Sequence, residues 1–329
     1  MGTGEFELIA KFVERLPAPG PEVLIASGDD AAVAYHLEGP VVVSVDALIE
    51  GVHFTRPEFD ARSIGRKAMA AAISDLAAMG AEPAHAYVVV GLPPGMSEGE
   101  VLELADGVAE ISNRDRIPVI GGDLVSSPQL MVSVTAIGGE ASGTTLVPRS
   151  SAEPGNAVVV TGEIGGAAAA LRVLQRERID DRERALLSRQ FNPPSRLEAG
   201  KVLAGHGATA MIDLSDGLGA DADRLARASG VSIEIDAATV PFQSGALDAL
   251  DSTKSTVDSS TAAVSGGEDY ELLACIPPDR VDGARTALGG SCALTVIGSV
   301  GEGLGARITN PDGTELPIAG FDHLRPDQA

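Results

Sequence analysis

The sequence predicts a protein of the α/β (or α+β) class with two domains. Apolar runs rich in β-branched residues alternate along the chain with segments of helical periodicity. The chain has 329 residues, which is enough for two domains of ordinary size. A turn-rich segment, Pro148–Gly155, precedes a new strand and marks the boundary. We therefore expect an N-terminal domain over residues 1–148 and a C-terminal domain over residues 149–329.

The apolar runs predict strands, several of them buried on both faces. In chain order these are Val41–Val45, Ala86–Val90, Pro118–Ile120, Leu130–Ile137, Ala157–Val160, Ala210–Ile212, Val231–Ile235, Leu272–Ile276 and Leu294–Ile297. Helical periodicity predicts helices over Ser63–Met79, Ser97–Ile111, Gly166–Gln175, Ser195–Leu203 and Gly217–Ala228. The stretch Asp251–Ala262 is rich in Ser, Thr and Asp and predicts a surface loop.

The composition argues against some classes of partner. The formal net charge of -23 and the pI of about 4.5 disfavour nucleic acid and anionic membrane surfaces. A phosphorylated substrate stays compatible with this charge, because Mg²⁺ can invert the sign of an acidic pocket. Lysine is scarce, so the acidic surface fits either an adaptation to high salt or an ordinary enzyme of low pI. A salt titration of thermal stability separates these two explanations.

Two features predict a cytoplasmic protein. Cys275 and Cys292 form no CxxC pair and lie in apolar contexts, as expected of buried thiols in a reducing compartment. The segment Met1–Phe12 lacks the basic and apolar regions of a secretion signal. No apolar run approaches the roughly 18 residues that a membrane span needs.

Six short acidic clusters close or interrupt apolar stretches. They lie at Gly28–Val33, Ser44–Ala47, Ile73–Leu76, Gly121–Leu124, Ile212–Gly217 and Gly266–Glu271. Carboxylates that converge at strand ends repel one another unless cations lie among them. The pattern therefore predicts a site for several metal ions that binds a polyphosphate.

Asp75 provides the strongest geometric argument. At 100° per residue it lies roughly 30° from the centre of the apolar stripe of its helix, whereas Arg66 and Lys67 lie away from that stripe. An ionised Asp on a buried face is costly unless it is paired, hydrogen-bonded or metal-bound. A hydrogen bond to a main-chain N–H or an Arg is the alternative to a metal.

Asp46 and Asp123 each end an apolar strand, which is where open α/β folds gather ligands. Gly121 and Gly122 would let the main chain approach a phosphate closely. For each Asp taken singly, a helix cap or an Asx-turn is the more ordinary role.

Asp213, Ser215 and Asp216 lie within one turn at a helix start, where capping alone would need one residue. The Gly-rich turn Thr161–Gly166 could present N–H groups to an anion, but it lacks the lysine of a Walker A motif, and close helix–strand packing is its alternative role. His53 has no spacing that predicts a metal ligand. No motif for nucleophilic catalysis is present.

Taken together, these motifs resemble the thiamine-monophosphate kinase family over nearly the whole chain. The matching segments are Gly4–Phe6, Gly28–Ala31, Val45–Asp46, Glu50–Phe54, Ser74–Ala81, Gly121–Asp123, Arg149–Ser150, Asp213–Leu218, Gly266–Leu272 and Gly320–His323. The resemblance implies the fold of the aminoimidazole-ribonucleotide-synthetase-like ATP enzymes. In that fold the N-terminal sheet pairs across a homodimer, and a C-terminal α/β domain completes the cleft for ATP and substrate.

The resemblance also implies the reaction, which is ATP-dependent phosphorylation of thiamine monophosphate to thiamine diphosphate. Several Mg²⁺ ions would take part, with K⁺ as a further candidate. The implied metal ligands are Asp30, Ser44, Val45 (through its main chain), Asp46, Asp75, Asp123, Asp213 and Asp216. The implied ATP contacts are Gly122, Asp123, Arg149 and Ser215. The implied thiamine-phosphate contacts are His53, Glu268 or Asp269, and Phe321.

No catalytic side chain is expected, because a phosphate ester has a second pKa near ~6 and is itself an ionised nucleophile at neutral pH. The chain departs from the family at Val45 and Leu124, where Thr is frequent. A main-chain metal contact would make Val45 harmless, whereas a hydroxyl contact would be lost. Two alternatives to the kinase remain: a related selenophosphate or aminoimidazole-ribonucleotide synthetase, and a non-catalytic module that binds Ca²⁺ or nucleotide. The absence of any Cys before Cys275 argues against a selenophosphate synthetase.

Overall fold

The computed structural model describes residues 5–27, 31–35, 39–56, 58–176, 178–251, 258–318 and 320. Its contacts divide the chain into two compact units, one of residues 1–76 and 81–140 and the other of residues 77–80 and 141–329. Both units combine a sheet with helices, so the predicted mixed α/β class is confirmed.

The first unit is built on a four-stranded sheet with the order β3-β6-β4-β5. Strands β4 and β5 are parallel, whereas β6 is antiparallel to β3 and to β4. The strands are β3 (Val41–Ile49), β4 (Ala81–Leu92), β5 (Val119–Ser126) and β6 (Met131–Glu140), and each overlaps a predicted strand. The first unit also contains an antiparallel pair of short strands, β1 (Val23–Ile25) and β2 (Val33–Ala34), which the apolar runs do not predict.

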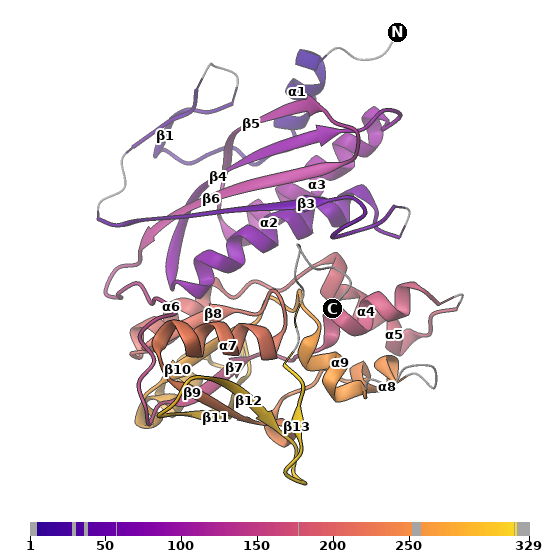
Figure 1. Cartoon of the computed structure of the whole chain (residues 1–329). Helices are drawn as coiled ribbons and strands as arrows, with labels where there is room; N and C mark the ends of the chain where they lie inside the picture. The colour runs from indigo at the N-terminus through magenta and orange to yellow at the C-terminus, as the bar shows by residue number, and fades with distance from the viewer. Residues whose placement is uncertain are drawn as a thin grey trace. The chain divides into compact units, whose positions relative to one another are not determined.

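Two long helices, α2 (Ala61–Ala78) and α3 (Glu98–Asp115), cover one face of this sheet (Figure 1). The side chains of Val132, Val134 and Ala136 on β6 are fully buried, as the period-2 alternation of a strand requires of the covered face. Helix α3 starts at a capping box between Ser97 and Glu100. The shorter helix α1 (Glu5–Val13) contacts α3 and β5.

Lys67 is an exception to the predicted faces of α2. We expected it away from the buried stripe, but its side chain is fully buried. Its Nζ atom donates to the carbonyl oxygen of His53 at 3.1 Å and lies 5.2 Å from the centre of the Phe59 ring. Lys67 is buried because α2 is covered around most of its circumference, so that a residue well to the side of the stripe is covered as well.

The second unit contains a seven-stranded sheet with the order β13-β12-β9-β11-β7-β10-β8. All its neighbours are antiparallel except β12 and β9. Its strands are β7 (Ala157–Thr161), β8 (Ala210–Asp213), β9 (Ser232–Asp236), β10 (Leu272–Ile276), β11 (Leu294–Gly301), β12 (Gly305–Thr309) and β13 (Glu315–Leu316). Strands β7 to β11 are predicted by the apolar runs, and β12 and β13 are not.

The second unit also contains the predicted helices α4 (Gly166–Leu174), α6 (Leu197–Gly205) and α7 (Leu218–Ser229). It further holds four helices without a predicted counterpart: α5 (Asp181–Phe191), α8 (Ala246–Leu250), α9 (Ser259–Ser265) and α10 (Val281–Leu288). The end of the predicted surface loop is helical instead, because it belongs to α9. Asp258 caps this helix by accepting hydrogen bonds from the N–H groups of Ser260 and Thr261. Within the described ranges, no helix combines the length and hydrophobicity that crossing a bilayer requires.

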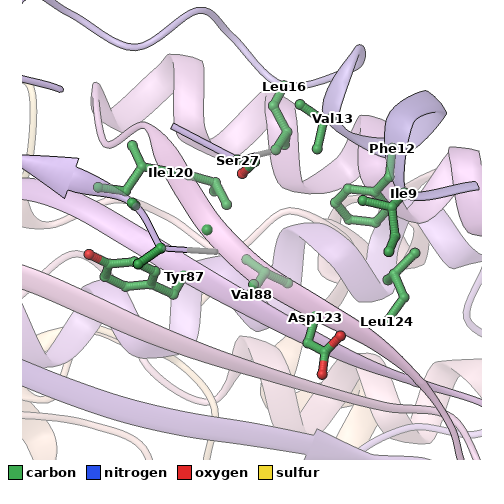
Figure 2. Close-up of a pocket in the computed structure, with 15 residues that line it drawn as sticks. Ile9, Phe12, Val13, Leu16, Ser27, Tyr87, Val88, Ile120, Asp123 and Leu124 are labelled. Carbon is green, nitrogen blue, oxygen red and sulfur yellow. The ribbon is translucent and has the colours of Figure 1, made fainter. Parts of the chain in front are cut away.

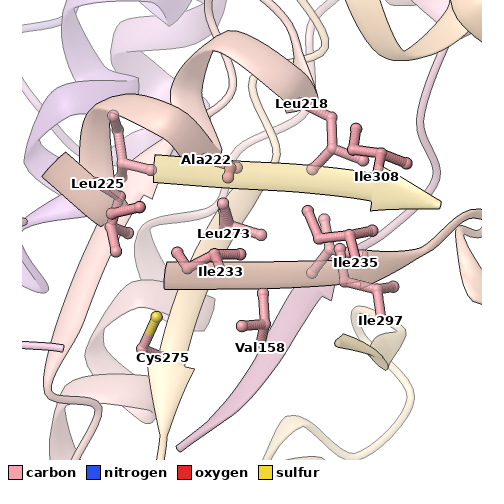
Figure 3. Close-up of a cluster of buried hydrophobic side chains, with 14 of the residues drawn as sticks. Val158, Leu218, Ala222, Leu225, Ile233, Ile235, Leu273, Cys275, Ile297 and Ile308 are labelled. Carbon is pink, nitrogen blue, oxygen red and sulfur yellow. The ribbon is translucent and has the colours of Figure 1, made fainter. Parts of the chain in front are cut away.

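The main core of the second unit lies between α7 and the sheet. Leu218, Ala222 and Leu225 of α7 face Ile233 of β9 and Ile308 of β12, as Figure 3 shows. The cluster is almost entirely aliphatic, as the low aromatic content of 3% requires. This core fixes the end of β8, where Asp213 lies, and the start of α7, which Ser215 and Asp216 precede.

Candidate functional site

In the first unit, Ser44 and Asp75 form a hydrogen-bonded pair between β3 and α2. The Ser44 hydroxyl donates to Asp75 Oδ2 at 2.5 Å. Ser44 is 8% exposed, and Asp75 is half-buried. As expected for an Asp near the buried face of its helix, the Asp75 carboxylate is hydrogen-bonded. The pair also brings together two oxygen atoms that could bind a metal ion.

Alternation along β3 decides which groups lie near this pair. Ser44 and Asp46 stand opposite the fully buried Ala136 and Val134 of β6, so both lie on the helix-covered face. The Val45 side chain lies on the opposite face and is 66% exposed. Val45 can therefore contribute only main-chain atoms beside Ser44 and Asp46, and the absent Thr hydroxyl would also have pointed away.

Asp123 lies on β5 at the margin of a cavity of about 720 Å³ (Figure 2). The lining combines α1 and the following turn, the segment around Ala31, and strands β4 and β5. Its described lining is mostly apolar, with Asp123 as the charged residue among those described, and includes Ile9, Phe12, Val13, Leu16, Val88, Val119, Ile120 and Leu124. A site of this composition suits a flat apolar group that carries a charged extension.

Gly122 also lines this cavity, and its backbone requires glycine. Its φ angle is 157°, and a Cβ atom there would lie 1.9 Å from the carbonyl oxygen of Val88. The close approach of β4 and β5 at this point therefore accounts for Gly122 independently of any ligand.

His53 lies in the turn that follows β3. Its Nδ1 atom accepts a hydrogen bond from the N–H of Ile49 at 3.0 Å, so the neutral ring carries its proton on Nε2. The buried Lys67 ammonium binds the His53 carbonyl oxygen. Glu50 and Arg56 close the same turn with two hydrogen bonds of 2.9 and 3.1 Å. The turn thus holds His53 in one orientation with Nε2–H as a donor.

These residues supply donors that suit a hard cation, but they do not form a complete metal site by themselves. Among the described residues, no group of three or more His, Cys, Asp or Glu side chains is placed to hold a metal ion. Asp30, an expected ligand, lies outside the described residues. The donors in place are a hydroxyl and carboxylates, which are the oxygen ligands that Mg²⁺ takes.

In the second unit, Asp213, Ser215 and Asp216 follow one another at the end of β8. Asp213 is 5% exposed. Asp216 forms an ion pair with Arg224 of α7. The nearby Asp221 of α7 accepts the N–H groups of Asp216 and Gly217 at 3.0 and 3.1 Å and so fixes the turn before the helix. The N-cap residue of α7 is Gly217, and no described side chain accepts a capping hydrogen bond there. Asp213, Ser215 and Asp216 are therefore not needed for capping α7.

The Glu268 turn, defined here as residues 266–271, lies directly beside this segment. The N–H of Glu268 donates to the Ser215 carbonyl oxygen at 2.9 Å, and the N–H of Tyr270 donates to that of Leu214 at 3.0 Å. Glu268 and Tyr270 have φ angles of 69° and 50°, which are uncommon for residues other than glycine. The last acidic cluster is thereby joined to the preceding one.

Asp269 and Glu268 have different surroundings within this turn. Asp269 is 2% exposed, and its two carboxylate oxygens accept the N–H groups of Gly165 and Ala167 at 2.7 and 3.0 Å. Burial raises the pKa of Asp269 to about 6, against the opposing effect of these hydrogen bonds. The Gly-rich turn before α4 thus binds a carboxylate of the chain itself. Glu268 is half-buried, and its Oε2 atom accepts from Gln190 Nε2 at 2.9 Å.

Glu271 ends the turn with a buried ionic cluster that the sequence does not indicate. The fully buried carboxylate pairs with Arg189 and Arg196 and accepts the Thr161 hydroxyl at 2.7 Å. Burial works against the charge of Arg196, but Glu271 outweighs it and raises the pKa of that guanidinium. The glutamate belongs to a recognised acidic cluster, whereas its arginines lie on or just after the unpredicted helix α5.

The remaining expected site residues are Arg149 and Phe321. Arg149 is exposed, and its carbonyl oxygen accepts the Ser229 hydroxyl at 2.9 Å. Phe321 lies outside the described residues. Residues that the sequence does not single out for the site are Lys67, Gln190, Arg224 and the two arginines of Glu271.

Known proteins resemble this chain over most of its length. The AIR synthase related protein N-terminal and C-terminal domain models match residues 28–139 and 153–309. A thiamine-monophosphate kinase of Mycobacterium tuberculosis (strain CDC 1551 / Oshkosh) is 38% identical over 283 residues, covering 86% of this chain and 84% of that protein. The thiamine-monophosphate kinase structure from Stenotrophomonas maltophilia K279a has a TM-score of 0.79 and 34% identity, covering 92% of this chain and 94% of that one. AaThiL complexed with AMPPCP and TMP has a TM-score of 0.76 and 32% identity, covering 86% and 87%.

Proposed function

Because this chain belongs to the thiamine-monophosphate kinase family, we propose that it transfers the terminal phosphoryl group of ATP to thiamine monophosphate. The products are ADP and thiamine diphosphate. The observation that carries the proposal is the 32% identity, at a TM-score of 0.76, to a relative that is complexed with AMPPCP and TMP. The two-domain AIR-synthase-related fold supports the same conclusion.

The reaction asks the protein for positioning and charge neutralisation more than for covalent chemistry. An oxygen of the thiamine-monophosphate phosphate attacks the terminal phosphorus of ATP in line, and ADP leaves. The attacking phosphate is largely ionised at neutral pH, because its second pKa is near ~6. No general base is needed, so the chain's task is to hold two anions within reach of each other and to exclude water.

We assign metal-binding roles to oxygen ligands in each unit. In the first unit these are Ser44, Asp46, Asp75 and Asp123, together with the main chain of Val45 and with Asp30. In the second unit they are Asp213 and Asp216. Bound Mg²⁺ would neutralise the phosphates and the charge that develops during transfer. The Ser44–Asp75 hydrogen bond at 2.5 Å supports this assignment, because it already orients two of these donors toward each other. K⁺ is a further candidate ion.

We assign the cavity beside Asp123 to the nucleotide. Its apolar lining, formed by Phe12, Val88 and Ile120 among others, suits a purine ring. Gly122 and Asp123 would then lie where the phosphates leave the cavity. Arg149 and Ser215 are further proposed ATP contacts. Arg149 is exposed and so can offer its planar guanidinium to a phosphate.

We assign thiamine monophosphate to His53, to the acidic Glu268 turn and to Phe321. The fixed Nε2–H of His53 can donate to a phosphate or to a ring nitrogen. The carboxylate of Glu268 or Asp269 would balance the thiazolium cation, and Phe321 would pack on a thiamine ring.

The enzyme is proposed to work as a homodimer in the cytoplasm. On the sheet face of the first unit that lies opposite α2 and α3, Val41, Val43 and Val45 are 49%, 57% and 66% exposed. An apolar row of this kind on a sheet is the expected mark of an interface. Cys275 and Cys292 are both free thiols, which suits a reducing compartment.

The activity is tested with purified protein, ATP and Mg²⁺ and with thiamine monophosphate, thiamine or aminoimidazole-ribonucleotide precursors as separate acceptors. We expect ADP and thiamine diphosphate to form in equal amounts with thiamine monophosphate alone. ADP formation with another acceptor, or binding of nucleotide without turnover, would replace the proposal by one of its rivals.

A further inference from the structure

The Glu268 turn stores backbone strain at one point. Glu268 and Tyr270 both adopt left-handed conformations, with φ angles of 69° and 50°, on either side of Asp269. Such a conformation is unfavourable for a residue with a side chain and persists only where surrounding contacts hold it. Strain of this kind gathers at ligand-binding and catalytic positions, so the contacts that maintain it bear on function.

Asp269 lies between these two strained residues, and its carboxylate makes hydrogen bonds that hold the turn. It is 2% exposed, and each of its oxygens accepts one N–H group at the start of α4, from Gly165 and from Ala167. Because both oxygens are engaged and the side chain is buried, Asp269 faces the interior of the unit. Its charge is balanced by two N–H donors of the chain and by the nearby Arg189.

The side chain of the neighbouring residue Glu268 is less buried than that of Asp269. Its main-chain N–H is fixed to the Ser215 carbonyl oxygen at 2.9 Å, and its side chain is half-buried. Gln190 orients the Glu268 carboxylate, because Gln190 Nε2 donates to Glu268 Oε2 at 2.9 Å. The same amide donates to the Ala167 carbonyl oxygen at 3.2 Å. One short segment at the start of α4 therefore binds both Asp269 and the residue that orients Glu268.

We propose that Asp269 is a positioning residue, which binds the start of α4 and thereby holds Glu268 beside Ser215 for contact with the substrate. Glu268 is then the group that faces the thiazolium cation, and Asp269 does not touch it. This assignment rests on the proposed kinase function. It divides the acidic pair by role, with one carboxylate for the ligand and one for the fold of the turn.

The kinetic test is a double-mutant cycle between Asp269→Asn and Glu268→Gln. Asparagine keeps the shape of the side chain but can accept only one of the two N–H bonds. We expect Asp269→Asn to raise the KM for thiamine monophosphate at least tenfold, and to change it less than twofold when Glu268→Gln is already present. Asp236→Asn is the matched control, because Asp236 caps a turn in the same unit through the Ala238 N–H, and it should leave KM unchanged.

Amide hydrogen exchange provides a readout that does not depend on activity. In Asp269→Asn, exchange should become faster at Gly165, Ala167 and Glu268, and in Asp236→Asn it should not. If Asp269→Asn does not fold, Gln190→Met tests the same arrangement, since it removes the donor that orients Glu268 and should raise the same KM. Additive effects in the cycle, or a raised KM with unchanged exchange at Gly165 and Ala167, would overturn the proposal in favour of a direct substrate contact.

The wild-type enzyme separates this proposal from the proposed function. If wild-type protein does not phosphorylate thiamine monophosphate, the kinase proposal fails, whereas the exchange experiment still shows whether Asp269 holds the turn. If wild type is active and the cycle is additive, the kinase proposal stands and only the positioning role fails.

Discussion

At the scale of single residues, the placement of Asp75 shows how far helical arithmetic can reach. The periodicity of α2 predicts a carboxylate near the buried stripe, and the structure gives it a hydroxyl partner, Ser44, on the facing strand. The identity of that partner could not be predicted, because it depends on which strand packs against the helix. Lys67 marks the limit of the same arithmetic, since periodicity cannot tell that α2 is covered on nearly all sides.

The first prediction concerns Asp75. We expect Asp75→Asn to lower kcat/KM for thiamine monophosphate at least about a hundredfold, because an amide is a poor ligand for Mg²⁺ and removes one negative charge from the proposed metal site. The fold should survive, since an amide oxygen still accepts the Ser44 hydroxyl. Initial rates of thiamine diphosphate formation and circular dichroism provide the measurement.

The control for this prediction is Asp106→Asn, which alters a carboxylate of the same unit that pairs with Arg15 and Arg62 on the surface. Its activity should match wild type. Asp123→Asn should behave like Asp75→Asn. Wild-type activity in a well-folded Asp123→Asn protein would remove that residue from the metal site.

A second prediction follows from the buried Asp269. Its pKa is raised to about 6 in the folded protein, chiefly by burial, and is about 3.9 in an unfolded chain. The native state therefore binds the additional proton between about pH 4 and pH 6. The contribution of Asp269 to the free energy of unfolding is fully present below this window and is lost as pH rises through it, by on the order of 2–3 kcal/mol.

Urea denaturation of wild type and Asp269→Asn over this pH range measures whether the free energy of unfolding changes in the predicted direction. The stability of wild type relative to the variant should fall as pH rises from about 4.5 to about 6.5. A difference between the two proteins that stays constant over this range would contradict the assigned pKa.

At the scale of elements, the long periodic helices and apolar strands were predictable because each carries its own local pattern. Helix α5 was not, since most of its residues are polar and, among those whose side chains are described, only Leu186 and Gln190 are fully covered. Helix α1 is short and is held by ion pairs to α3, such as Lys11–Glu98, which no local pattern records. The ionic partners of Glu271 were missed for the same reason, because they come from outside the recognised motifs.

The third prediction tests the contact between α2 and α3. A Cβ atom at Gly107 would lie 2.0 Å from the main-chain oxygen of Arg62, so the two helices can approach only with glycine there. We expect Gly107→Ala to lower the free energy of unfolding by at least about 2 kcal/mol, because the helices must move apart. Chemical denaturation measures the change.

Gly99→Ala on the same helix is the matched control. Gly99 is exposed, and a Cβ atom there would meet only the Ser97 hydroxyl at 3.9 Å. Alanine should raise stability by about 0.5–1 kcal/mol, as helix propensity alone predicts. An equal effect of the two substitutions would mean that the packing of α2 on α3 is not limited by Gly107.

At the scale of the whole molecule, the two-domain α/β class was predictable from alternating elements and chain length. The contact between the last two acidic clusters, Ile212–Gly217 and Gly266–Glu271, was not predictable from either segment alone. Strand ends indicated where carboxylates gather, but the strand order of the second unit, β13-β12-β9-β11-β7-β10-β8, follows from long-range pairing that no local pattern contains.

The fourth prediction concerns the proposed homodimer. Val43 is 57% exposed on the sheet face of the first unit that lies opposite α2 and α3, so Val43→Glu should place a charge in the proposed interface and yield monomers. Leu304→Glu is the control, because Leu304 is 65% exposed in the second unit, and it should leave the mass unchanged. Light scattering after size exclusion gives the masses. A wild-type protein that is monomeric at micromolar concentration would contradict the dimer.

The central claim is direct transfer of a phosphoryl group from ATP to the phosphate of thiamine monophosphate, and label transfer tests it most directly. Protein is incubated with Mg²⁺, thiamine monophosphate and ATP that is isotopically labelled in its terminal phosphate, and the products are separated. We expect the label in the terminal phosphate of thiamine diphosphate, in an amount equal to the ADP formed, and no transfer without Mg²⁺. Label that appears only as inorganic phosphate, or that stays in ATP, would contradict the claim.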